Sequence, residues 1–129
     1  MIKSTHPEIE ITVHNQFVED RSLINHDRYF FAYTITIHNH GPLNIQLISR
    51  HWIIENSAGK KFEVKGDGVI GQQPIINEGE SYTYTSGTEI DTPTGFMSGT
   101  YKMKSKEGHF FDSQIPKFEL QMPRTLHLN

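Results

Sequence analysis

Apolar and polar residues alternate along most of this chain, which is the pattern of β-strands that bury one face. The clearest run covers residues 29–39, where aromatic and β-branched residues occupy one face and polar residues the other. The same pattern predicts strands over residues 8–18, 45–56, 61–65, 81–86, 100–104 and 110–118. No segment shows the 3.6-residue period of an amphipathic helix. We therefore predict an all-β fold of about seven strands, an antiparallel two-sheet sandwich of the fibronectin type III or immunoglobulin-like class.

The strand expected over residues 45–56 is apolar on both faces, which suggests a central strand. Strict alternation divides it into two sets, with Ile48, Arg50, Trp52 and Ile54 on one face and Leu47, Ser49, His51 and Ile53 on the other. Trp52 is expected between the sheets. If Arg50 points inward beside it, the guanidinium needs a carboxylate or several carbonyl acceptors, because an unpaired buried charge is costly.

The remaining segments are expected to be connections. Residues 19–27 and 87–99 are interpreted as loops, residues 56–59 as a hairpin turn and residues 106–108 as the turn of a second hairpin. We expect one domain over residues 1–129, with an ordered core over about residues 7–121 and a frayed tail over 122–129.

Composition and charge exclude several classes of protein. The chain has no cysteine, so thiolate metal sites and a cysteine nucleophile are excluded. Its net charge of −3, without a basic block, disfavours direct nucleic-acid binding. The sequence shows no apolar run of membrane-spanning length and no signal-peptide pattern, so we expect a cytoplasmic protein without membrane insertion.

The glycine-rich segment over residues 66–74 carries the letters of a dinucleotide-binding fingerprint, with Gly66, Gly68 and Gly71 at the required spacing. That fingerprint needs a helix directly after the glycines, and here Pro74 follows with no amphipathic pattern. We interpret the glycines as structural, with φ above zero or in a bulge. The surviving functional alternative is a phosphate held by backbone N–H groups of this turn.

Two further groups of residues are candidate sites. Arg50, His51, Asp67 and Asp91 could form a polar cluster at one end of the sandwich, either as a surface that binds an anion or a partner or as an internal ion pair that fixes the glycine turn. His38 and His40 are weak candidates for a metal site, with His51 on the next strand as a third ligand. The alternative is a pair of surface histidines with no role in metal binding. No cofactor is expected. No Gly-x-Ser-x-Gly elbow is present, so an enzyme is not expected.

Five segments together resemble the ApaG family, also called CorD. They cover residues 31–37, 47–54, 66–74, 84–87 and 91–101, and the most specific are Ser49-Arg50-His51-Trp52 and Asp91-Thr92-Pro93. The resemblance implies a fibronectin type III-like fold in a bacterial cytoplasmic protein, with links to cobalt resistance and magnesium efflux. In eukaryotic relatives the domain resembles a protein-interaction module. Gln72 stands where Glu is common in the family, which weakens any role of this turn in cation binding.

Two functions from different classes remain as hypotheses. The first is a noncatalytic binding module that recognises a protein partner or small anion through the loops near Arg50 and the Gly66–Gly71 turn. The alternative is a divalent cation homeostasis or efflux factor that binds Co²⁺, Mg²⁺ or a phosphate-containing ligand directly. Dinucleoside polyphosphate hydrolysis is a third, weaker alternative. Strand edges could also pair two copies into a homodimer, although no residue requires it.

Overall fold

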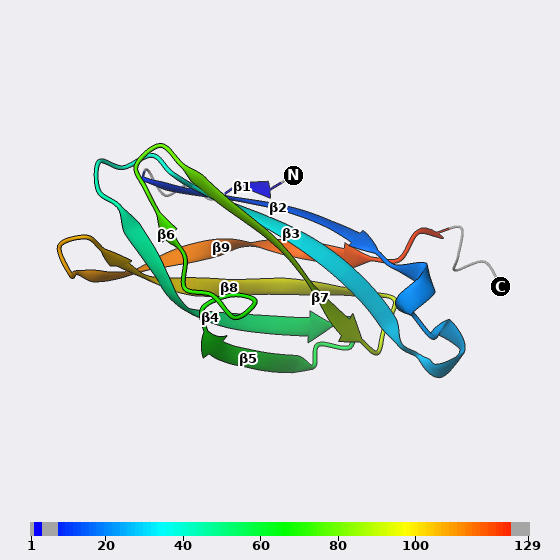
Figure 1. Ribbon diagram of the computed structural model, residues 1–129. Helices are drawn as coiled ribbons and strands as arrows, with labels where there is room; N and C mark the ends of the chain where they lie inside the picture. Colours follow the sequence, from blue (N-terminus) through cyan, green and yellow to red (C-terminus); the bar gives the residue numbers. More distant parts are fainter. Residues whose placement is uncertain (1, 4–7, 125–129) are drawn as a thin grey trace.

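The computed structural model, which describes residues 2–3 and 8–124, contains two antiparallel sheets packed face to face (Figure 1). The strands are β1 (Ile2–Lys3), β2 (Ile9–Phe17), β3 (Tyr29–Asn39), β4 (Ile45–Asn56), β5 (Lys61–Asp67), β6 (Ile75–Ile76), β7 (Ser81–Ile90), β8 (Thr94–Ser105) and β9 (Phe110–Gln121). One sheet has the order β1-β2-β3-β7; the other has the order β5-β4-β8-β9, with β6 paired to β4. The predicted all-β sandwich is confirmed.

Two short 3-10 helices, Glu19–Arg21 and Ile24–His26, interrupt the segment expected to be a loop between β2 and β3. No α-helix occurs within residues 2–3 and 8–124. Nor does that part of the chain contain a helix of the length and hydropathy needed to cross a bilayer.

The prediction of a loop over residues 87–99 is wrong. β7 continues to Ile90 and β8 begins at Thr94, so only the three residues between them form the turn. Gly87 and Gly95 lie inside these strands, at positions where neighbouring groups leave no room for a side chain. A Cβ on Gly87 would come within 2.3 Å of the Phe30 ring, and one on Gly95 within 2.5 Å of the Glu55 carbonyl oxygen. These glycines mark close packing and not chain breaks.

The strict alternation expected along β4 is also wrong in its first half. The register between β4 and β8 shifts between Leu47 and Ser49, which marks a β-bulge at Ile48. Leu47 is therefore buried in the core, although alternation placed it on the face opposite Trp52. Residues before the bulge therefore lie on the face opposite to the one that alternation from Trp52 predicts. This explains why strict alternation put apolar residues on both faces of the strand.

Trp52 lies in the core between the sheets, as predicted, at the centre of an aromatic cluster. Its ring centroid is 5.3 Å from that of Tyr33 on the opposite sheet and 6.0 Å from that of Phe118. Tyr101 packs edge-on against it at 6.3 Å. These offset and edge-to-face contacts stabilise the pairing of the two sheets beyond simple area burial.

The expected frayed tail does not begin at Met122. That side chain is buried, and its backbone N–H donates to the carbonyl of Pro93 at 3.0 Å. The end of the predicted tail, residues 125–129, and the predicted start of the ordered core at residue 7 lie outside the described residues.

Candidate functional site

Arg50 is placed on β4 directly opposite Gly66 on β5. Its guanidinium Nη1 donates to the carbonyl oxygens of Asp67 at 3.1 Å and Gly68 at 2.9 Å. A Cβ on Gly66 would come within 2.8 Å of both Nη atoms, so the missing side chain there makes room for the guanidinium. The carbonyl acceptors required for an inward Arg50 are therefore supplied by the end of the neighbouring strand. The internal ion pair considered as one alternative is not seen between Arg50 and Asp67, which contributes its backbone carbonyl instead of its carboxylate.

The turn after Gly66 is held in a tight conformation by its own backbone. The N–H of Gly68 donates to the carbonyl of Ile48 at 2.8 Å, and Val69 and Gln72 exchange two backbone hydrogen bonds. Gly68 and Gly71 have φ values of 60° and 78°, as predicted for structural glycines. The chain then continues to the short strand β6, so the glycines join extended segments and lack the helix that a dinucleotide fold requires.

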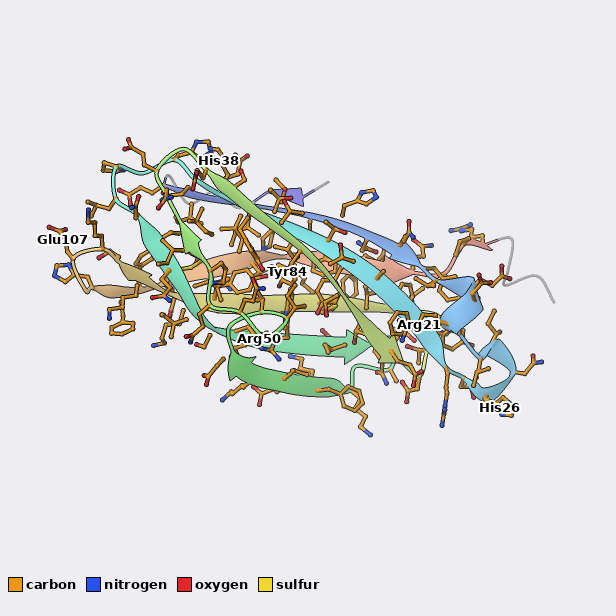
Figure 2. The ribbon with its side chains drawn as sticks, viewed as in Figure 1. Arg21, His26, His38, Arg50, Tyr84 and Glu107 are labelled. Atoms are coloured by element: carbon orange, nitrogen blue, oxygen red, sulfur yellow. The ribbon has the colours of Figure 1, made fainter. Side chains whose placement is uncertain are left out.

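Three buried tyrosines, Tyr33, Tyr84 and Tyr101, feel the charge of Arg50, and no pattern in the sequence indicated them. In Figure 2 Arg50 is labelled beside the turn that follows β5, and Tyr84 is labelled above it. The hydroxyls of Tyr84 and Tyr101 share a hydrogen bond, and Tyr33 and Ser86 line the same pocket beside Arg50. Burial raises the pKa of all three phenols, and the nearby charge of Arg50 opposes that rise.

Ile70 is a second feature that sequence reasoning missed. It has a φ of 42°, which is strained for a β-branched residue, and its side chain is 56% exposed. It occupies the tip of the turn between Gly68 and Gly71. The glycines on either side were visible in the sequence, but no local signal indicates that Ile70 shares their conformation.

A pocket of about 200 Å³ opens beside Arg50 between the two sheets. Its lining comes from both sheets and contains no carboxylate: Tyr33, Arg50, Trp52, Ile54, Val64, Ser86, Gly87, Thr88 and Met97. Within the described residues Arg50 forms no ion pair, and its Nε and Nη2 make no hydrogen bond. The pocket therefore presents a half-buried cation whose Nε–Nη2 edge has no protein partner.

A larger pocket of about 550 Å³ adjoins the first one. It is lined by His26, Asp27, Arg28, Ile54, Phe62, Val64, Thr88, Glu89, Ile90 and Asp91. Ile54, Val64 and Thr88 line both pockets. The two pockets therefore lie side by side between strands β5 and β7, and we call them together the β5–β7 groove.

The predicted cluster of Arg50, His51, Asp67 and Asp91 at one end of the sandwich does not form. His51 Nε2 lies 3.0 Å from a carboxylate oxygen of Glu63, apart from the groove. Asp91 accepts a hydrogen bond from Asn56 Nδ2 at 2.9 Å and lines the larger pocket. Along β4, Asn56 is six positions from Arg50, a distance of about 20 Å in a strand. Arg50 and Asp91 therefore lie toward opposite ends of the β5–β7 groove.

His38 and His40 lie close together, with ring centroids 4.2 Å apart. Each has its own partner: His38 Nδ1 lies 2.5 Å from Ser81 Oγ, and His40 Nε2 lies 2.8 Å from a carboxylate oxygen of Glu10. Among residues 2–3 and 8–124, no three His, Cys, Asp or Glu side chains are placed to hold a metal ion together. His51 does not join this pair, so the geometry does not assemble the three-ligand set considered from the sequence.

The fold and the groove define this protein as a small β-sandwich of the fibronectin type III-like class that is hollowed along one edge. Comparison with known proteins gives the family. Residues 19–105 match the family model described as the ApaG domain, and the chain belongs to the ApaG family. It is 47% identical to protein ApaG of Aromatoleum aromaticum, with 98% of this chain and 100% of that protein covered.

Other relatives agree with this assignment over almost their full lengths. Protein ApaG of Vibrio vulnificus is 48% identical, with 94% of this chain and 96% of that protein covered. A crystal structure of a Bordetella pertussis protein named ApaA superposes with a TM-score of 0.88 at 42% identity, covering 91% of this chain and 95% of that one. These comparisons give the family and the fold, and they assign no ligand.

Two glycines of the turn provide a matched test of its geometry. Both have positive φ, but a Cβ on Gly68 would lie 2.0 Å from the Gln72 carbonyl oxygen, whereas one on Gly71 would meet nothing within 4 Å. Gly71→Ala should cost about 1–2 kcal/mol, the penalty for left-handed backbone alone. Gly68→Ala should cost clearly more, because the backbone must also move. Urea unfolding measures both, and equal costs would show that the turn is not packed as described.

The buried tyrosines predict a loss of stability at alkaline pH. The pKa of Tyr84 and that of Tyr101 are raised in the folded protein by burial, whereas an unfolded tyrosine ionises near pH 10. Their contribution is therefore complete below about pH 10 and falls as pH rises, by about 1.4 kcal/mol per pH unit for each group. Urea unfolding between pH 9 and 11 should show a shallower decline for Tyr84→Phe than for the wild type. Parallel declines would contradict this assignment.

Proposed function

We propose that this protein is a noncatalytic, cytoplasmic binding module that recognises a protein partner or small anion through Arg50 and the turn over residues 66–71. The observation that carries this proposal is the state of the Arg50 guanidinium. It is partly buried, it is held by two backbone carbonyls through Nη1, and it forms no ion pair with a carboxylate of the described residues. A cation in that state favours an incoming anion, because its position is already fixed and part of its hydration is already lost.

The geometry of the guanidinium favours a carboxylate over a spherical anion. The Nε and Nη2 N–H groups lie side by side on one edge and match the two oxygens of a carboxylate. The carbonyls of Asp67 and Gly68 both bond to Nη1, so they do not occupy that edge. The pocket beside Arg50 adds the hydroxyl-bearing residues Tyr33, Ser86 and Thr88 as neighbours for the bound group.

The tyrosines near Arg50 support the noncatalytic part of the proposal. A general base near neutral pH needs a group that gives up its proton there. Burial raises the pKa of Tyr84 and that of Tyr101 above the ordinary value, so neither phenol readily becomes a phenolate. Their role is to pack beside Arg50 in the core. The alternative of direct cobalt or magnesium binding gains no support from the described residues, in which His38 and His40 lack a grouped third donor.

Three variants test this proposal by quantitative affinity capture from bacterial lysate. Arg50→Gln keeps much of the side chain and removes the charge. Gly66→Ala keeps the charge and forces the guanidinium to move. His51→Gln, one position along β4, is the matched control because His51 does not line the β5–β7 groove. Partners recovered by the wild type and His51→Gln should fall about tenfold or more with Arg50→Gln, and less with Gly66→Ala.

Circular dichroism and urea unfolding confirm that each variant is folded before capture is compared. Equal recovery of every partner by folded wild type, Arg50→Gln and Gly66→Ala would remove Arg50 from the recognition site. A loss common to all three variants, including His51→Gln, would likewise contradict a role specific to the Arg50 guanidinium.

A further inference from the structure

The two sheets do not cover each other along one side of the molecule. β7 ends one sheet and β5 ends the other, and Figure 1 shows β5 at the lower margin of the molecule with β7 crossing above it. Phe62 and Val64 on β5 pair with the buried residues Ile54 and Trp52 of β4, yet they are 39% and 41% exposed. These two apolar side chains therefore lie on the groove side of β5 without a strand of the opposite sheet above them.

The free edge of β7 lies beside this uncovered surface. Edge strands are usually protected from pairing by charged residues, proline or bulges. Residues 81–88 of β7 contain no charged residue and no proline. β5 is different, because Lys61, Glu63 and Lys65 stand at alternate positions along it. Of the two edges that border the β5–β7 groove, β7 is the one open to an added strand.

The groove has opposite charges toward its two ends. Arg50 supplies a cation beside the smaller pocket. The larger pocket is lined by three acidic residues, Asp27, Glu89 and Asp91. The basic residues in its lining are Arg28 and His26. Between these ends the lining is mainly apolar. A ligand that fills the whole groove should therefore carry an anionic group at one end, apolar groups in the middle and a cationic group at the other end.

The spacing of these features matches an extended chain. Arg50, Trp52, Ile54 and Asn56 are separated by two positions each on β4, and the amide of Asn56 holds Asp91. A strand lying across the groove with the same rise has side chains of one face at positions 1, 3, 5 and 7. Charged residues at positions 1 and 7 then reach the two ends, and apolar residues at positions 3 and 5 reach Phe62 and Val64.

We propose that the β5–β7 groove binds an extended partner segment of the pattern Lys-x-apolar-x-apolar-x-Glu, paired antiparallel to β7. The direction follows because β7 runs from Ser86 beside Arg50 toward Ile90 beside Asp91, so an antiparallel segment places its lysine first and its glutamate against Arg50. The main-chain hydrogen bonds of β7 supply affinity, and the alternate side chains supply specificity. This inference rests on the proposed function and names the chemistry of its partner.

Fluorescein-labelled peptides with blocked ends test the inference by fluorescence anisotropy on the full chain. The probes are Lys-Thr-Val-Thr-Val-Thr-Glu and its reverse, Glu-Thr-Val-Thr-Val-Thr-Lys. The wild type should bind the first peptide about tenfold or more tightly than the second. Arg50→Glu should lose the first peptide and bind Lys-Thr-Val-Thr-Val-Thr-Lys in its place.

A second pair of variants does not depend on replacing Arg50. Val64→Lys places a charge on the apolar floor of the groove and should weaken the first peptide about tenfold. Glu63→Lys makes a charge change at the next position, outside the groove lining, and should bind as the wild type does. Amide shifts of ¹⁵N-labelled protein on binding should follow residues 86–90 of β7.

Each contrary outcome overturns the inference. These outcomes are equal affinity for both peptide orders, equal loss with Val64→Lys and Glu63→Lys, amide shifts confined to β5, and no binding of any peptide. A free protein that sediments as a dimer with protected β7 amides would show that a second copy occupies the edge instead. Capture of partners that still depends on Arg50 would in every such case leave the proposed function standing, so the two claims fail separately.

Discussion

The interaction on which this structure depends is the contact between the Arg50 guanidinium and the carbonyls of Asp67 and Gly68. A charge next to an aromatic core is costly unless acceptors are in place. The chain supplies them near the end of β5, where the guanidinium lies over Gly66, and in the sharp turn at Gly68 that follows. The turn presents backbone oxygens to Arg50 in place of side-chain carboxylates, so no carboxylate within residues 8–124 pairs with its charge.

That same contact fixes the geometry of the open side of the sandwich. β5 is paired to β4 along its length and tied to Arg50 at its end, so it extends the lower sheet beyond the cover provided by β7. Two hydrophobic side chains of β5, Phe62 and Val64, remain half-exposed in consequence. The groove thus exists because the two sheets do not fully overlap along this side. The contact between Arg50 and the turn fixes the position of its cationic end.

The sequence predicted the architecture well because alternation is a strong signal. β3 and β4 match the predicted strands over residues 29–39 and 45–56. The errors have identifiable causes. Gly87 and Gly95 were interpreted as loop residues, but they are small because a ring and a carbonyl approach them. The bulge at Ile48 carries no sequence signal, and it moved Leu47 to the core face.

The candidate site was only partly predictable. In the hairpin that turns after Asn56, Arg50 and Gly66 lie the same number of residues from the turn. Their pairing could therefore be predicted from the sequence once the hairpin was recognised. The separation of Arg50 from Asp91 could not be predicted from the sequence, because it depends on where the chain crosses from β7 to β8. The uncovered face of β5 could not be predicted either, since it arises from how the two sheets overlap.

The proposal that Arg50 is a preorganised and accessible carboxylate site can be tested directly. The most direct measurement is an acetate titration of ¹⁵N-labelled protein at constant ionic strength, with sodium chloride as the reference and the Nε–H signal of Arg50 as the probe. A saturable shift of that signal is expected, accompanied by shifts of the amides of Gly66 and Gly68. A response of Arg50 that is linear and no larger than that of the exposed Arg21 would contradict this proposal.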